Sequence, residues 1–264
     1  MEQTVFKKLK EMGVGFETRS DTFSGSLPIL VMIHGAGGQS QLWQNQTRFL
    51  KDSVNAVALD LPGHGHTRGP KMPDVETYAE WLGDTLNDLF ERPVFLMGHS
   101  FGGAVVQQTA LLYPDLLHGI ILVGTGPRLQ VAPAFLEGLL KDFEKTVDSI
   151  IGFAYASGAD VSMIKEGARL MKTAGAEVVH GDFLACNLFD LRNKVAKIRT
   201  PCLIICGDQD KLTPVSLSES LKKLIKGSRF EIVPSAGHMV MIEKYKVLNN
   251  YVTGFIKTVI KNAD

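Results

Sequence analysis

A serine flanked by glycines is the first residue whose setting indicates chemistry. Ser100 lies in the stretch Gly98-His99-Ser100-Phe101-Gly102, after an apolar run and before a helical pattern. A Gly-x-Ser-x-Gly sequence at a strand-to-helix junction is typical of a nucleophile elbow, a strained turn that exposes the serine oxygen above a sheet. An ordinary glycine-rich turn is the alternative. The buried strand expected before the motif and the helix expected after it favour a catalytic serine.

A serine hydroxyl is a weak nucleophile and needs a base that a third group holds in place. The chain has seven histidines, so position must choose among them. Where a serine sits on such an elbow, the catalytic residues follow the chain order Ser, then Asp or Glu, then His. His238 follows the last expected strand, where ligands gather at the carboxyl edge of an open sheet. His180 also lies downstream of Ser100, but in a stretch without strand signals, and we predict His238 as the base.

The acid is expected in the loop that follows the apolar run at 202–206, where two carboxylates compete. Asp208 is closer to the strand end and could cap the turn with its side chain. Asp210 lies deeper in the loop, where it can reach a histidine ring. The loop after the preceding strand, Gly124-Thr125-Gly126-Pro127, has no carboxylate. We therefore predict Asp210 as the acid and Asp208 as its rival.

Acyl transfer also needs backbone N–H donors for the developing oxyanion. One donor is expected from Phe101, the residue after the nucleophile, and the other from a loop after an earlier strand. The apolar run at 29–33 leads into His34-Gly35-Ala36-Gly37-Gly38, whose glycines allow the backbone to approach a substrate. We predict Ala36 as the second donor, with Gly37 as the next candidate and a plain turn as the alternative.

Short apolar runs separated by helical patterns would position these residues. The runs are mostly continuous rather than alternating, which is typical of strands buried on both faces of a parallel sheet. Helical patterns at Val75–Phe90, Ala104–Leu112 and Val240–Ile260 predict βα units with helices on both sheet faces. At the start of the chain a helix face near 5–12 and an edge strand at 14–18 are possible. The predicted strands are Ile29–Ile33, Val54–Leu59, Val94–Met97, Ile120–Val123, Cys202–Cys206 and Phe230–Val233.

The strand pattern breaks between residues 127 and 193, where Phe, Leu, Ile and Met recur at helical spacing. So long a stretch without a strand favours a helical cap inserted over the carboxyl edge of the sheet. A longer helical layer on one sheet face is the alternative. We expect an α/β core formed by residues 1–126 and 194–264, with a cap formed by 127–193.

Composition limits the kinds of partner. The chain has 264 residues, of which 45% are apolar and 21% charged, enough for one large domain or two small ones. Lys plus Arg equals Asp plus Glu at 28 each, so the totals show no excess of positive charge that would indicate binding to nucleic acid or an anionic membrane. We expect a monomer or small homo-oligomer that acts on a small molecule. Early charges and short apolar runs make a cytoplasmic location the default.

The cysteines do not suggest a disulfide framework, because there are only three. On one strand, Cys202 and Cys206 would face the same side but lie about 13 Å apart. That separation excludes a disulfide or a shared metal, and we expect both to be buried core thiols. We expect no metal and no cofactor.

The assembled pattern resembles the α/β-hydrolase superfamily from about Pro28 to the end of the chain. The matching segments are His34-Gly35 followed by Trp43, Asp60-Leu61-Pro62-Gly63-His64-Gly65, the Gly98–Gly102 elbow, Asp210 with Pro214, and Gly237-His238 with Glu243. This resemblance implies the α/β-hydrolase fold. It also implies that His34 and His64 are structural loop residues and that His99 is the variable position of the elbow. One departure is Tyr245, near which many relatives carry a proline.

Members of this superfamily with such a layout include carboxylesterases, lactonases, carbon–carbon bond hydrolases and cofactor-free peroxidases. The fold alone does not choose between them. Because the expected cap is rich in Phe, Leu, Ile and Met, we expect hydrolysis of a small, largely apolar ester through an acyl-enzyme. The alternatives are a carbon–carbon bond hydrolase or lactonase and, in another class, a hydrolase-like ligand receptor that retains its triad.

Overall fold

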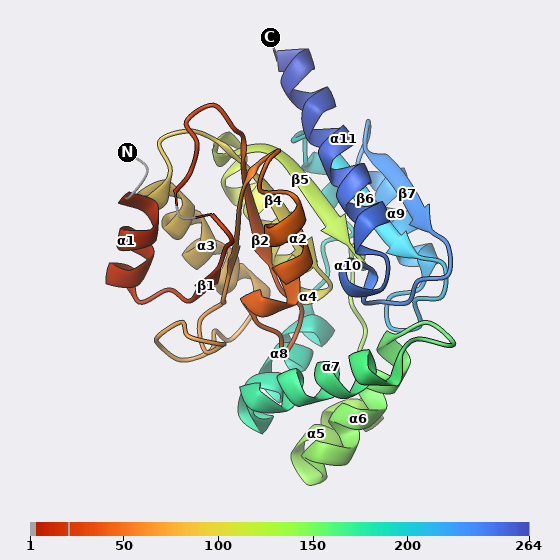
Figure 1. Ribbon diagram of the computed structural model, residues 1–264. Helices are drawn as coiled ribbons and strands as arrows, with labels where there is room; N and C mark the ends of the chain where they lie inside the picture. Colours follow the sequence, from red (N-terminus) through yellow and green to blue (C-terminus); the bar gives the residue numbers. More distant parts are fainter. Residues whose placement is uncertain (1–3, 21, 264) are drawn as a thin grey trace.

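The computed structural model describes residues 4–20 and 22–263, and in these residues one sheet of seven strands organises the chain (Figure 1). The strand order is β1-β3-β2-β4-β5-β6-β7, and β1 alone runs antiparallel to its neighbour. The predicted α/β fold with a mostly parallel sheet is confirmed. The strands are β1 (Phe16–Glu17), β2 (Ile29–Ile33), β3 (Asn55–Leu59), β4 (Val94–His99), β5 (Leu117–Val123), β6 (Cys202–Gly207) and β7 (Arg229–Val233).

The central strands explain the continuous apolar runs. Every residue of β2, β3, β4 and β6 is buried, as strands covered on both faces require. β7 differs, because it is the last strand of the sheet and Ile232 is 41% exposed. The edge position explains why the run at 230–233, unlike the central strands, is not uniformly buried.

Helices cover the two faces of the sheet with separate apolar cores. On one face, α1 (Thr4–Met12), α3 (Val75–Leu89) and α4 (Phe101–Leu112) pack with the odd-numbered residues of β2. On the other face, α10 (Val240–Glu243) and α11 (Tyr245–Ala263) pack with its even-numbered residues, and α2 (Gln44–Phe49) contacts β3, α10 and α11. α9 (Val215–Leu224) connects β6 to β7. Short 3-10 turns lie at Ser40–Trp43, Pro114–Leu116 and Val195–Lys197.

The helical pattern expected as one helix over Val240–Ile260 is broken in the structure. Lys244 leaves the helical region with φ −131° and ψ 41°, so α10 ends at Glu243 and α11 begins at Tyr245. Tyr245 therefore stands at the first position of a helix, where proline is well tolerated. None of the described helices is both long enough and apolar enough to cross a bilayer.

Four helices between β5 and β6 form a group beyond one end of the sheet (Figure 1). They are α5 (Pro133–Lys141), α6 (Phe143–Ala154), α7 (Val161–Ala174) and α8 (Ala176–Leu188), and we refer to them as the α5–α8 layer. Residues 127–193 are all described and contain no strand, only an isolated bridge between Arg128 and Asp190. The division of the chain into a core and a cap domain stays a prediction.

Candidate active site

Ser100 occupies a strained turn between β4 and α4. Its backbone has φ 53° and ψ −116°, a left-handed conformation that costs energy for a residue with a side chain and is often found at functional sites. Glycines make the turn possible. A Cβ at Gly98 would lie 2.3 Å from the Gly102 carbonyl oxygen, and a Cβ at Gly102 would lie 2.4 Å from that of His34. The predicted elbow geometry is therefore present.

His238 and Asp210 meet through a short hydrogen bond. The distance from His238 Nδ1 to Asp210 Oδ2 is 2.8 Å, and both side chains are buried. The other carboxylate oxygen of Asp210 accepts the N–H groups of Leu212 at 2.9 Å and Thr213 at 2.8 Å. Asp208 instead accepts the Ala236 N–H at 3.3 Å. The geometry thus pairs the histidine with Asp210 and gives Asp208 the turn-capping contact.

The environment keeps Asp210 ionised. Burial alone would raise its pKa, but attraction to His238 and the hydrogen bonds from His238 and Thr213 outweigh burial, and the pKa is lowered. An ionised carboxylate accepts a hydrogen bond from the Nδ1–H of the histidine, which favours the tautomer whose Nε2 is free to act as a base.

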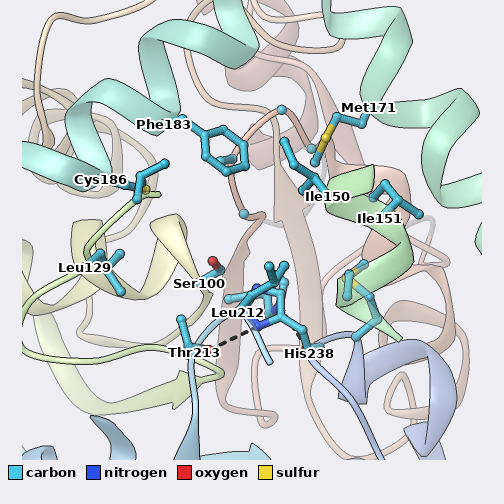
Figure 2. A pocket seen from close by; sticks show the side chains of 18 of the residues that line it. Ser100, Leu129, Ile150, Ile151, Met171, Phe183, Cys186, Leu212, Thr213 and His238 are labelled. Atoms are coloured by element: carbon cyan, nitrogen blue, oxygen red, sulfur yellow. Dashed lines mark hydrogen bonds between the residues drawn. The ribbon is translucent and has the colours of Figure 1, made fainter. Parts of the chain in front are cut away.

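Ser100 and His238 line the same cavity, at the end formed by the carboxyl edge of the sheet (Figure 2). Within the described chain no hydrogen bond joins the Ser100 hydroxyl to the histidine ring. Catalytic hydrogen bonds are often long without substrate and tighten in the complex. The structure therefore brings all three predicted residues to one site, with the Asp–His contact formed.

The N–H groups around Ser100 distinguish the two candidates for the second oxyanion donor. The Gly37 N–H donates to Asp182 at 2.8 Å and is already occupied. Among the described residues we find no acceptor for the Ala36 N–H or for the Phe101 N–H at the start of α4. Ala36 also lines the cavity beside Ser100. The arrangement leaves Ala36 and Phe101 as the available donors.

Two further residues of the site escaped the sequence interpretation. The Thr213 hydroxyl donates to Asp210 Oδ2 at 2.7 Å and lies 3.0 Å from His238 Nδ1. His99 has a ring centroid 4.4 Å from that of His238, and its Nε2 hydrogen-bonds to the His238 carbonyl oxygen at 3.0 Å. Thr213 stands three residues after the acid in a loop, a spacing that could have identified it. The contact of His99 depends on the fold.

The cavity has a volume of about 230 Å³ and an apolar wall. Aliphatic and aromatic side chains from the α5–α8 layer surround its upper part, as Figure 2 shows for several of them. Such a wall favours apolar substrate groups. His180 lies on α8 and is not among the lining residues. The large apolar residues of the wall include Leu129, Phe135, Ile150, Ile151, Leu170, Met171, Phe183 and Leu217.

The described residues contain no cluster of three or more His, Cys, Asp or Glu side chains arranged to hold a metal. The three cysteines are free and buried, as expected for Cys202 and Cys206. Cys186 also lines the cavity, and burial raises the pKa of its thiol well above the ordinary value. It is therefore a protonated wall residue rather than a thiolate.

Comparison with known proteins identifies the family and the fold. The model of a family described by the alpha/beta hydrolase fold matches residues 28–245. A pimeloyl-[acyl-carrier protein] methyl ester esterase of Pseudoalteromonas atlantica is 29% identical over 83% of this chain and 90% of its own length. The structure of a thermophilic esterase, 34% identical, superposes with a TM-score of 0.81 over 93% of this chain and 98% of that one. An enol-lactonase from Burkholderia xenovorans, 20% identical, has a TM-score of 0.82 over 92% of this chain and 95% of its own, a likeness of fold.

Proposed function

The chain belongs to the α/β-hydrolase family, and on that premise we propose that it is a serine esterase that cleaves small, largely apolar carboxylic esters. The joint geometry of three residues carries the proposal. Ser100 stands on the elbow and lines an apolar cavity together with His238, whose Nδ1 lies 2.8 Å from Asp210. The esterases among the similar proteins lend support.

The proposed reaction has two halves. His238 Nε2 takes the hydroxyl proton as Ser100 Oγ attacks the ester carbonyl, and the Ala36 and Phe101 N–H groups stabilise the oxyanion. When the C–O bond breaks, the alcohol leaves with the proton from His238. Water then enters, gives a proton to His238 and attacks the acyl-serine, and the carboxylic acid is released as Ser100 recovers its proton.

The test is a panel of p-nitrophenyl esters, lactones and a vinylogous diketone, assayed with the wild type and Ser100→Ala. The proposal expects ester turnover and labelling of Ser100 by a fluorophosphonate probe, both lost in Ser100→Ala while its circular dichroism stays unchanged. Thr146→Ala is the control and should keep both turnover and labelling, because Thr146 is half-buried in the α5–α8 layer, away from the cavity lining, and its hydroxyl donates to the Asp142 carbonyl oxygen.

Three outcomes would contradict the proposal. Faster cleavage of the diketone than of any ester would indicate a carbon–carbon hydrolase, and faster opening of lactones would indicate a lactonase. Probe labelling without turnover of any compound would favour the ligand receptor.

A further inference from the structure

A buried carboxylate in the α5–α8 layer contacts the oxyanion loop, which we define as residues 34–38. Asp182, on α8, is 1% exposed. Its Oδ2 accepts the Gly37 N–H at 2.8 Å and lies 2.7 Å from His64 Nε2, and its Oδ1 lies 3.5 Å from the Tyr78 hydroxyl. These partners are 145, 118 and 104 residues away in the chain. The carboxylate thus joins the helical layer to the loop beside the nucleophile.

The contacts of His64 require a charged ring. Its Nε2 faces the Asp182 carboxylate, and its Nδ1 faces the Pro62 carbonyl oxygen at 3.1 Å. Both partners are acceptors, so both ring nitrogens must carry a proton. Burial lowers the pKa of His64, but the hydrogen bond and charge of Asp182 outweigh it, and the pKa is raised above 6.5. Asp182 and His64 therefore form a buried ion pair.

The neighbouring histidine, His34, is neutral. His34 Nδ1 faces the Gly35 carbonyl oxygen at 2.8 Å, while its Nε2 accepts the Leu61 N–H at 3.1 Å. This ring is neutral with one fixed tautomer, and burial together with the nearby His64 lowers its pKa to about 4. His34, the first residue of the oxyanion loop, joins the loop to the Leu61 backbone, but a neutral ring does not neutralise Asp182. His64 performs that role.

Gly37 is fitted closely against the helical layer. Its φ is +60°, and a Cβ there would lie 2.9 Å from Val179 on α8 and 3.0 Å from Met171 on α7. The hydrogen bond to Asp182 fixes the plane of the peptide between Ala36 and Gly37. Because that peptide follows the Ala36 N–H directly, its orientation also limits where the Ala36 N–H can point.

We propose that Asp182 is a positioning residue, whose carboxylate holds the Gly37 N–H so that the Ala36 N–H faces the oxyanion of the transition state. Asp182 is not among the residues that line the cavity, so its effect passes through the loop. The oxyanion hole is then complete only when α8 is packed against the loop. The inference rests on the proposed esterase function for its catalytic part.

The first test is Asp182→Ala, which removes the acceptor of the Gly37 N–H. Loss of one oxyanion donor lowers kcat by about 10²- to 10³-fold. A loosened donor should lower kcat by roughly 10- to 100-fold with little change in KM, and should weaken a boronic acid inhibitor that mimics the tetrahedral state. Asp148→Ala, which changes an exposed carboxylate of α6 paired with Lys172, is the control and should leave kcat, KM and inhibition unchanged.

The second test does not require turnover and follows the Gly37 amide by NMR hydrogen exchange. The amide should be protected in the wild type and in Asp148→Ala, and should lose protection in Asp182→Ala. This separates the two ideas. If the protein has no esterase activity but protection of the Gly37 amide still depends on Asp182, the proposed function is wrong and the contact is confirmed. The catalytic role of Asp182 would then be withdrawn as well.

The third test uses Asp182→Asn, which keeps an oxygen acceptor and remains informative if the alanine variant does not fold. The titratable groups that face this pair are His34, Asp60, Tyr78 and Cys186, and Lys71 lies close to Gly181, the residue before Asp182. In the wild type, kcat should fall at alkaline pH as His64 loses its proton. Without the carboxylate the pKa of His64 drops, so in Asp182→Asn this fall should begin at lower pH.

The inference is overturned if folded Asp182→Ala keeps its kcat, or if KM rises while kcat is unchanged, because the residue would then shape the cavity. An alkaline limb that stays at the same pH in Asp182→Asn would also overturn it.

Discussion

At the scale of single residues, the site uses two histidine–aspartate pairs with different tasks. His238 and Asp210 lie at the cavity, where the histidine must exchange protons. His64 and Asp182 are buried away from it, where both ring nitrogens of His64 face acceptors. In the first pair Nε2 remains free for substrate, and in the second pair no nitrogen is free. The number of acceptors around the ring decides whether such a pair can act as a base or only hold its surroundings.

The first pair gives a prediction about the acid. Asp210→Asn replaces an acceptor with an amide that can donate to Nδ1, which favours the wrong tautomer of His238. Turnover of p-nitrophenyl esters should fall on the order of 10⁴-fold. Asp208→Asn keeps an oxygen that can accept the Ala236 N–H and should lower turnover by less than about tenfold. Steady-state kinetics of both variants is the check. A larger loss of turnover in Asp208→Asn than in Asp210→Asn would assign the acid to Asp208.

The second pair gives a prediction about stability and pH. The pKa of His64 is raised in the folded protein above its ordinary value of 6.5. The contribution of His64 to the stability of the folded protein is therefore fully present below pH 6.5 and is lost as the pH rises through the pKa of His64 in the folded state. His64→Gln leaves Asp182 without its charged partner and should cost about 3–5 kcal/mol at pH 6.

The check is urea unfolding of the wild type and His64→Gln at pH 6 and pH 9. The difference in free energy of unfolding should narrow at the higher pH, because the wild type loses the ion pair there. A difference that stays constant between the two pH values would show that His64 contributes as a neutral residue.

At the scale of the elements, the elbow depends on the close approach of β4, α4 and the loop after β2. Gly102 faces the His34 and Ile33 carbonyl oxygens, so a side chain here would meet backbone atoms that cannot rotate away. The sequence predicted this turn because glycine spacing is a local signal. It also predicted the segments that deliver Asp210 and His238, since each follows an apolar strand.

Other features depend on contacts that local patterns do not contain. In the sequence, nothing distinguishes Asp182 from any other acidic residue of a largely apolar helix, because its partners lie more than a hundred residues away. The exposed edge at β7 depends on strand order, and the break at Lys244 interrupts an otherwise continuous helical pattern. Periodicity shows which residues form an element, but the sheet order and the packing of α8 decide what each side chain meets.

The elbow gives a prediction with a matched control. In Gly102→Ala the new Cβ would lie 2.4 Å from the His34 carbonyl oxygen, so the helix or the oxyanion loop must move. We expect a loss of about 1–3 kcal/mol in stability and a strong fall in kcat. Gly254→Ala, in α11 with nothing within 4 Å of the added atom, should instead stabilise the protein by about 0.5–1 kcal/mol.

Thermal unfolding and ester turnover of the two variants, measured side by side, provide the check. Equal behaviour of Gly102→Ala and Gly254→Ala would mean that the elbow tolerates a wider turn than its contacts indicate.

At the scale of the whole molecule, the α5–α8 layer contacts the site on both sides of the nucleophile. On one side Asp182 holds the oxyanion loop. On the other side Glu243 accepts the N–H groups of Ala156 at 2.8 Å and Gly237 at 2.9 Å, and the His238 N–H donates to the Ala154 carbonyl oxygen at 2.8 Å. The end of α6 is thus joined to the histidine loop. The layer provides the cavity wall and also orders the loops that carry the chemistry.

This wall leads to a prediction about chain length. Each acyl CH₂ buried in an apolar cavity contributes about 0.8 kcal/mol, which corresponds to roughly a fourfold gain in kcat/KM. Because the cavity holds only about 230 Å³, the gain should end at a short or medium acyl chain. A p-nitrophenyl ester series from acetate upward should therefore rise and then fall.

The position of that maximum depends on the side chains that close the cavity, and Phe183 offers the clearest test. Its ring lines the cavity from α8 (Figure 2). Phe183→Ala should open space at this wall and move the maximum of kcat/KM to a longer acyl chain, while acetate turnover falls less than twofold, since acetate does not reach that wall. Phe153→Ala is the matched control, because Phe153 lies on α6, is 45% exposed and is absent from the lining. It should leave the maximum in place. If both variants keep the wild-type maximum, the acyl group does not extend toward α8, and the chain-length limit must be set by the wall formed by Leu129 and Leu217 instead.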